Sequence, residues 1–451
     1  MMLDRFAARH SSPEAGAVRA FESAAFAVLA HRPGAAEGLD SCLALDPDFT
    51  AAHALKGLGA VLLARAELQP AIAASLADAR SAAARRGAST MTEAALFNAL
   101  AAASGGRLHE AAQGLSAALA RQPDDLLLMK LSVALNFMGG DLAGMRQASE
   151  TAMQAFDADR AGHGFILGCQ AFALEESGDR RAAEMFGRRA AEIEPADAWG
   201  LHAVAHVFEM EGRTGAGISW LEQTRANWQR CNNFSFHIAW HLALFHLAEG
   251  DHARVLELYD NSVRPAPTDD FRDIANAVSL LWRLEQDGVA VERRWDELAC
   301  IAERRRNDAS LMFASLHYLM ALKAAGRPAA AAQLLETIRA AASLPGDQAA
   351  VAAAVALPLA VAIQGRPRNT SGAARCLTGL STLGGSGAQR DIFLRIAAVS
   401  AADNGENAAA ERVLRLRQSL RAEDRFSRRV RRQLRLSEAK PSLPPIAAFA
   451  G

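Results

Sequence analysis

A recurring glycine is the feature of this sequence that most constrains its fold. At six positions a Gly precedes a polar residue and a run of small residues, and two looser copies continue the series. The eight copies are Gly106, Gly140, Gly178, Gly212, Gly250, Gly288, Gly326 and Gly365. They lie 34 to 39 residues apart, and breaks near Gly34, Leu68 and Gly405 extend the series. A period near 34 residues is typical of helix–turn–helix repeats of the tetratricopeptide kind.

Proline supports the same reading between the glycines. Pro47, Pro123 and Pro195 each follow a segment of helical composition, and proline cannot continue a helix. Alanine is abundant and aromatic residues make up only 6%, which suits helices packed closely through small side chains. The sequence therefore predicts an all-α fold, a tetratricopeptide-like superhelix (α-solenoid) of about ten hairpins over residues 1–436. Residues 437–451 are predicted to form a loose Pro/Ala-rich tail.

Charge and composition exclude several classes of function. The formal net charge is −1, so no long-range field favours a nucleic-acid partner. The arginine-rich stretch 411–435 carries an apolar stripe with Phe426 as its only aromatic residue, which indicates a terminal capping helix. The apolar run 349–363 contains Pro358 and is shorter than a membrane span. No nucleic-acid or membrane partner is expected, and homo-oligomerisation is left open.

The cysteines and the N-terminus indicate the compartment. The five cysteines are an odd number, are widely separated and form no CxxC pair, which favours a reducing environment. The N-terminal residues lack the apolar core of a signal peptide. We expect a soluble, cytoplasmic protein.

The stretch from Trp199 to His252 is the least random part of the chain. It contains six of the twelve histidines and four of the six tryptophans. On the helix after Pro195, His202, His206 and Glu209 share one stripe, because residues three and four apart face the same side. In the next repeat, His237 and Trp240 fall on the corresponding inner face, and His241 points towards the preceding helix.

These residues admit three interpretations. His202, His206, Glu209 and His237 would suit zinc or ferrous iron, which bind imidazole and carboxylate ligands. The more common situation is that imidazoles pack between helices and hydrogen-bond to one another. A role in acid–base chemistry or in direct ligand contact is the third interpretation.

A second polar cluster follows a Gly/Ser-rich connection at residues 380–388. Gln389, Arg390 and Asp391 could fold inward to meet a ligand, and Arg390 would suit a carboxylate through its bidentate geometry.

Several phrases resemble the family of tetratricopeptide repeat protein thirty-eight. They are DPDFTAAHALKG (46–57), GFILGCQAFALEESGDRRAAE (164–184), DAWGLHAVAHVFEMEGR (197–213), FHIAWHLALFHLAEGDHARVLELYD (236–260), SLLWRLEQDG (279–288) and LGGSGAQRDIF (383–393). The resemblance implies a tetratricopeptide-like solenoid throughout, and it implies no established reaction.

The chain also departs from the family's pattern. Val133, Gln170 and Gly387 stand where the family usually has His, and Asn276 and Ser315 stand at or near places where it usually has Asp. The two histidine pairs, Ser386 and residues 389–391 are retained. If the family shares a polar pocket, this chain retains the residues at the centre of the pocket and differs in the residues at its rim.

The leading hypothesis is a binding module whose concave groove, lined by His and Trp, holds a small molecule or a peptide. The alternatives are an enzyme that uses a metal or His/Glu acid–base chemistry in the same pocket, and a scaffold for protein assembly.

Overall fold

The computed structural model describes residues 2–87, 89–365 and 377–438, and within them the fold is all-helical. The only strands there are β1 (Met2–Leu3) and β2 (Arg9–His10), a two-residue antiparallel pair that aligns Met2 with His10. The predicted all-α class is confirmed. The fifth cysteine, Cys376, and most of the predicted tail lie outside the described residues.

Helices follow one another in packed pairs along the chain. The first half contains α1 (Ala15–Leu29), α2 (Ala35–Leu45), α3 (Thr50–Leu62), η1 (Ala66–Leu68), α4 (Gln69–Arg86), α5 (Met91–Ser104), α6 (Leu108–Leu119), α7 (Leu126–Gly139), α8 (Leu142–Ala155), α9 (His163–Glu176), α10 (Arg180–Ile193), α11 (Ala198–Glu211), α12 (Thr214–Gln223) and α13 (Arg225–Trp228). The second half contains α14 (Phe234–Glu249), α15 (His252–Leu258), η2 (Tyr259–Val263), α16 (Phe271–Gln286), α17 (Arg294–Arg304), α18 (Met312–Ala324), α19 (Pro328–Ala341), α20 (Asp347–Val351), η3 (Ala352–Ala356), α21 (Leu357–Gln364), η4 (Leu377–Leu383), α23 (Gly387–Asp403), α24 (Asn407–Leu420) and α25 (Arg425–Glu438).

The recurring glycines lie at the turns between paired helices, as the sequence predicts. All eight have a positive φ, and Gly140 and Gly212 directly follow the last residues of α7 and α11. A residue in this left-handed conformation ends a helix, and glycine adopts it without a steric penalty. The predicted proline stops are also confirmed, since α10 ends at Ile193, just before Pro195.

The first helix of most pairs is buried, and the second covers it. Helices α9 and α11 each bury twelve of their fourteen residues, whereas α10 buries three. Because every face of α9 and α11 is covered, neither helix lines an open groove. The concave groove expected from the sequence is therefore replaced, at these helices, by a closed interior.

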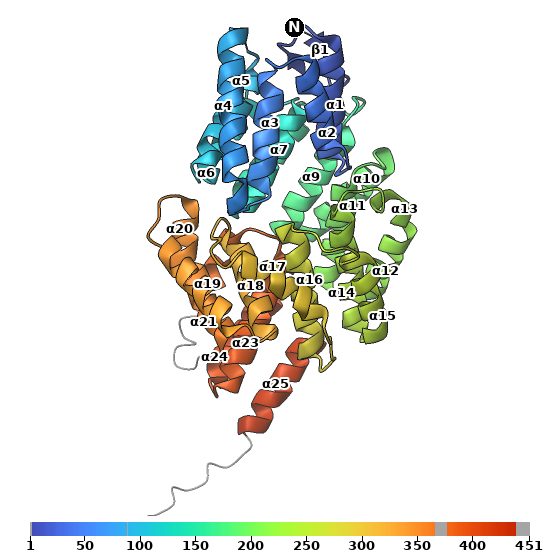
Figure 1. Cartoon of the computed structure of the whole chain (residues 1–451). Coiled ribbons are helices and arrows are strands. Elements are labelled where there is room, and N and C mark those ends of the chain that lie inside the picture. The colour runs from blue at the N-terminus through green and yellow to red at the C-terminus, as the bar shows by residue number, and fades with distance from the viewer. Residues whose placement is uncertain (1, 88, 366–376, 439–451) are drawn as a thin grey trace, which may run out of the picture.

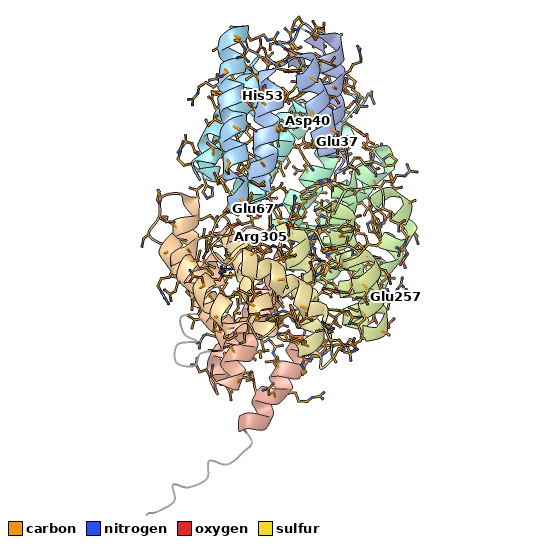
Figure 2. All side chains as sticks on the ribbon, in the orientation of Figure 1. Glu37, Asp40, His53, Glu67, Glu257 and Arg305 are labelled. Atoms are coloured by element: carbon orange, nitrogen blue, oxygen red, sulfur yellow. The ribbon has the colours of Figure 1, made fainter. Side chains whose placement is uncertain are left out.

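Contacts between distant parts of the chain close this interior. The Asn232 N–H donates to the His31 carbonyl (2.7 Å), and the Ala422 N–H donates to the Met210 carbonyl (2.7 Å). Figure 1 shows α1–α6 at the top, α10–α15 on one side, α17–α21 on the other and α23–α25 at the bottom. Near the junction of the upper and lower parts, Arg305 lies 3.4 Å from Glu67, and both are labelled in Figure 2.

Two predicted segments differ from the structure. Most of the 380–388 connection is helical, because η4 runs to Leu383 and α23 begins at Gly387. The arginine-rich stretch forms two helices, α24 and α25, and α25 continues past residue 436 to Glu438. The first difference adds helix to a Gly/Ser-rich segment, and the second divides the predicted capping helix between Leu420 and Arg425.

The helical stretch Asp347–Gln364 is longer than the apolar run seen in the sequence. By length and composition alone it could cross a membrane, and 44% of it is buried inside the protein. It packs against α18, α19 and α23 through buried side chains such as Val355 and Leu359. The length of this segment therefore does not exclude a membrane span, contrary to the argument from the apolar run 349–363. Its packing against neighbouring helices is that of a helix in a protein core.

Candidate functional site: a buried histidine cluster

Four imidazoles from two adjacent helices meet at one point in the interior. His202 and His206 lie one turn apart on α11, and His237 and His241 lie one turn apart on α14. His202 Nε2 lies 2.8 Å from both His206 Nε2 and His237 Nε2, and His241 Nε2 lies 3.3 Å from His237 Nε2. One ring nitrogen of each histidine lies within 4.8 Å of the others. The four side chains, here called the histidine cluster, are at most 8% exposed.

Local sequence features place α11 against its neighbours. The Asp197 carboxylate accepts hydrogen bonds from the Trp199 and Gly200 N–H groups and so caps the helix. A Cβ at Gly200 would lie 3.0 Å from the Cα of Gly168 on α9, so only glycine permits this approach. The close approach brings the end of α9 beside His206.

Carboxyl groups from α9 and α11 face the outer nitrogens of two cluster histidines. His241 Nδ1 lies 2.8 Å from Glu209 Oε2. His206 Nδ1 lies 3.3 Å from Glu175 Oε2 and 3.9 Å from Glu176 Oε1. At His241 the hydrogen bond with Glu209 holds the N–H on Nδ1 and leaves the Nε2 lone pair facing the centre, as partners of metal-binding histidines do.

A chain of hydrogen bonds from α23 reaches His237. The Ser386 N–H donates to Gln389 Oε1 (3.1 Å), and Gln389 Nε2 donates to Asn276 Oδ1 (3.1 Å). Asn276 Nδ2 lies 3.1 Å from His237 Nδ1. Because Nδ1 accepts from this amide, His237 carries its proton on Nε2, which points into the cluster.

Burial keeps the histidine cluster neutral. Burial, followed by the charge of neighbouring histidines, lowers the pKa of His202, His237 and His241 well below the usual 6.5. Burial also lowers the pKa of His206, although Glu176 and Glu209 oppose it. On the acidic side, burial raises the pKa of Glu175 to about 8. Neutral imidazoles with free lone pairs are the form that binds a metal ion.

Aromatic side chains wall the histidine cluster. The Trp240 ring stacks on His237 with centroids 5.5 Å apart, and the Phe172 ring stacks on His202 at 5.4 Å. Trp240 is completely buried, so it packs against the cluster and is not available to a ligand from solvent.

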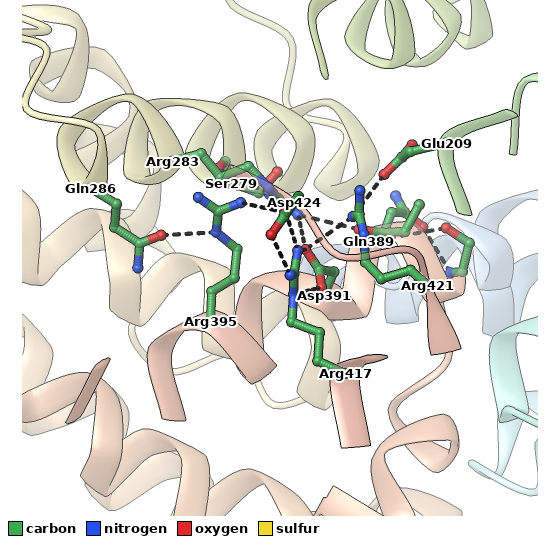
Figure 3. A network of polar contacts seen from close by, with 12 residues as sticks. Glu209, Ser279, Arg283, Gln286, Gln389, Asp391, Arg395, Arg417, Arg421 and Asp424 are labelled. Atoms are coloured by element: carbon green, nitrogen blue, oxygen red, sulfur yellow. Dashed lines mark hydrogen bonds and ion pairs between the residues drawn. The ribbon is translucent and has the colours of Figure 1, made fainter. Parts of the chain in front are cut away.

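The second predicted cluster also points inward, and Figure 3 shows part of it. Gln389 joins the chain to His237 described above. Arg390 donates to the Gly385 carbonyl and to Glu176 Oε2 (3.0 Å). Asp391 accepts from Arg417 Nε (2.6 Å) and Nη2 (3.1 Å). The carboxylate that Arg390 was expected to bind is thus the protein's own Glu176.

Three of the four predicted metal ligands, His202, His206 and His237, come together with a fourth imidazole, that of His241. The fourth predicted ligand, Glu209, contacts His241 Nδ1 on the outer side of the cluster. Glu209 could not be placed from spacing alone, because it lies almost one turn beyond His206 and faces α14.

Sequence reasoning missed the residues that other helices bring to the cluster. Glu175 and Glu176 end α9, and they lie next to the Gly178 turn with no histidine nearby in sequence. Asn276 was noted only as a departure from a family pattern. An adjacent Glu pair on an otherwise buried helix was the available signal.

No family model matches this chain.

Proposed function

We propose that this protein binds a divalent transition metal ion in its histidine cluster, with zinc or ferrous iron as the ion. The observation that carries the proposal is the convergence of ring nitrogens from His202, His206, His237 and His241 on one point. At a metal–nitrogen distance of about 2.0–2.1 Å, tetrahedral ligands lie about 3.3 Å apart. The Nε2 atoms of His202 and His206 lie 2.8 Å apart, and one ring nitrogen from each of the four histidines lies within 4.8 Å of the others, values on either side of that spacing.

Hydrogen bonding alone accounts less well for the cluster. The contacts link His206 to His202, His202 to His237, and His237 to His241. With the proton of His237 on Nε2, the His202 Nε2 lone pair accepts from His237, and the 2.8 Å contact with His206 is a hydrogen bond only if that same lone pair accepts a second N–H. A metal ion at the centre removes this conflict, because each free imidazole lone pair binds the ion.

A metal-dependent enzyme is the second candidate. Because the His237 Nε2 carries a proton, only the other three imidazoles can bind the metal ion. The fourth coordination position stays open, with the His237 N–H beside it as a hydrogen-bond donor. Three protein ligands with an open position are characteristic of catalytic zinc. X-ray absorption of the metal-loaded protein should then show three nitrogen ligands and one oxygen ligand. In Asn276→Asp the new carboxylate accepts a hydrogen bond from His237 Nδ1–H, which frees His237 Nε2 to bind the metal, and the same measurement should show four nitrogen ligands. Four nitrogens in the unchanged protein would exclude this candidate.

The metal proposal is tested on protein purified without a histidine tag. We expect about one transition metal ion per chain by elemental analysis, and loss of that ion in His202→Gln. The matched control is His246→Gln, because His246 lies on α14 in the same sequence stretch but outside the histidine cluster. If His202 only packs, the substitution should cost about 1–3 kcal/mol of stability and leave metal content unchanged.

The finer description of the fold belongs to the same proposal. We interpret the helix pairs as tetratricopeptide-like repeats of a superhelix, about ten hairpins long, because the glycine turns recur every 34 to 39 residues. The resemblance to the tetratricopeptide repeat protein thirty-eight family supports this interpretation. A cytoplasmic location stays a prediction, and Cys42, Cys169, Cys231 and Cys300 are free thiols.

A further inference from the structure

A cavity of about 390 Å³ lies at one end of the inner helices. The ends of α11 and α14 and parts of α16 and α23 form its walls, and the α24–α25 link covers it. Its lining includes Glu209, so the cavity reaches the residue that supports His241. Cavities of this volume are large enough for a small organic molecule.

Two buried guanidinium groups face this cavity without a hydrogen-bonded carboxylate. Arg283 is 2% exposed and donates only to the carbonyls of Ser279 (3.1 Å) and Ala388 (3.2 Å). Arg395 is 5% exposed and donates from Nε to Gln286 (3.0 Å). Their nearest carboxylate oxygens lie 3.7 to 4.0 Å away.

The nearby carboxylates are already engaged by other side chains. Arg417 binds Asp391 and Asp424 with four contacts of 2.6 to 3.1 Å, as Figure 3 shows. Asp287 lies 2.6 Å from Arg429. At the rim, Glu249 is bonded by Thr214 and Glu423 by Arg431. Arg283 and Arg395 therefore carry positive charge that the described protein residues compensate poorly.

The pKa values agree with this geometry. Burial is the largest influence on both groups, and it lowers the pKa of Arg283 to about 10 and that of Arg395 to about 9. Arg417, by contrast, has a raised pKa, because Asp391 and Asp424 outweigh the effect of its burial. A buried cation that lacks a partner is stabilised by an anion that enters beside it.

The remaining walls are apolar. Phe245, Leu244 and Leu247 line one side, and the Phe426 ring lies under the Arg395 guanidinium at 4.1 Å. The cation–π contact fixes the position of Arg395 at the cavity wall.

We propose that this cavity binds a small organic anion, with Arg395 and Arg283 holding its carboxylate or phosphate and Phe245, Leu244 and Leu247 packing on its apolar body. The site is separate from the proposed metal centre and does not depend on it.

The test measures binding of hexanoate, hexyl phosphate, inorganic phosphate and neutral hexanamide to the full chain by calorimetry. We expect hexanoate or hexyl phosphate to bind at least about tenfold more tightly than hexanamide and inorganic phosphate. Which of the two binds more tightly distinguishes a carboxylate from a phosphate ligand. Repeating the measurement after chelator treatment should give the same affinities, which separates this result from the metal proposal.

Variants locate the binding. Arg395→Gln should lose at least about tenfold in affinity for the tighter ligand. Arg432→Gln removes an equal charge from the exposed face of α25, outside the lining, and it should bind normally. Ala248→Phe fills the cavity without changing an arginine, and it should also abolish binding. Equal binding of hexanamide, or unchanged binding in a folded Ala248→Phe or Arg395→Gln protein, would overturn the proposal.

Discussion

Replacing Asp391 by Asn should destabilise the protein far more than the same change at an exposed ion pair. Asp391 is 2% exposed and accepts two hydrogen bonds from Arg417, while Arg421 lies at 3.3 Å. Breaking a buried pair by removing one partner typically costs about 3–5 kcal/mol, because the remaining charge is left uncompensated. The exposed control is Asp40→Asn, since Asp40 pairs with Lys56 at 2.6 Å with both side chains at least half exposed. Asp40 is labelled in Figure 2.

The expected shift in melting temperature follows from the chain length. An unfolding entropy of about 2.1 cal/mol/K per residue gives about 0.9 kcal/mol/K for 451 residues. Asp391→Asn should therefore lower the melting temperature by about 3–5 °C, and Asp40→Asn by about 1 °C or less. Circular dichroism melts at pH 7 measure both. Equal shifts in the two variants would refute the reasoning that the buried pair between Asp391 and Arg417 of α24 stabilises the fold more than an exposed pair does.

The pH dependence of this difference has a definite sign. Although burial raises the pKa of Asp391, Arg417 and Arg421 outweigh it and hold that pKa well below its usual value. A carboxylate with a lowered pKa in the folded state contributes stability above the unfolded pKa, near 4, and loses it as the pH falls further. The gap between the unchanged protein and Asp391→Asn should stay constant from pH 7 to 5 and narrow below about pH 4.

Two further predictions concern the histidine cluster. Glu209→Gln should weaken metal binding by about 10- to 100-fold in a chelator competition, because Glu209 orients His241, whereas Glu211→Gln, on the exposed end of α11, should have no effect. Because burial holds the pKa of His202 and His241 well below 6.5, protons should not compete with the metal at pH 6, and dialysis at that pH should leave the metal bound. Release that begins between pH 7 and 6.5 would contradict this.

The sequence by itself determined the local structure. Glycines with positive φ and prolines after helices act on the backbone of their own segment, so the positions of Gly140, Gly212 and Pro195 were enough to place helix ends. The i,i+4 spacing likewise determined that His202 and His206 share a face, as do His237 and His241.

Only the tertiary structure decided which residues from distant helices meet. The closure that buries α11 depends on contacts such as Ala422 with Met210, and these join segments that no local periodicity relates. The same packing places Glu175 next to His206 and pairs Asp391 with Arg417. A side chain at a closed interface contacts whichever segment packs against it. Which segment that is depends on the fold of the whole chain. An open groove and a closed interior can therefore share one sequence pattern and differ in which distant helices pack against each other.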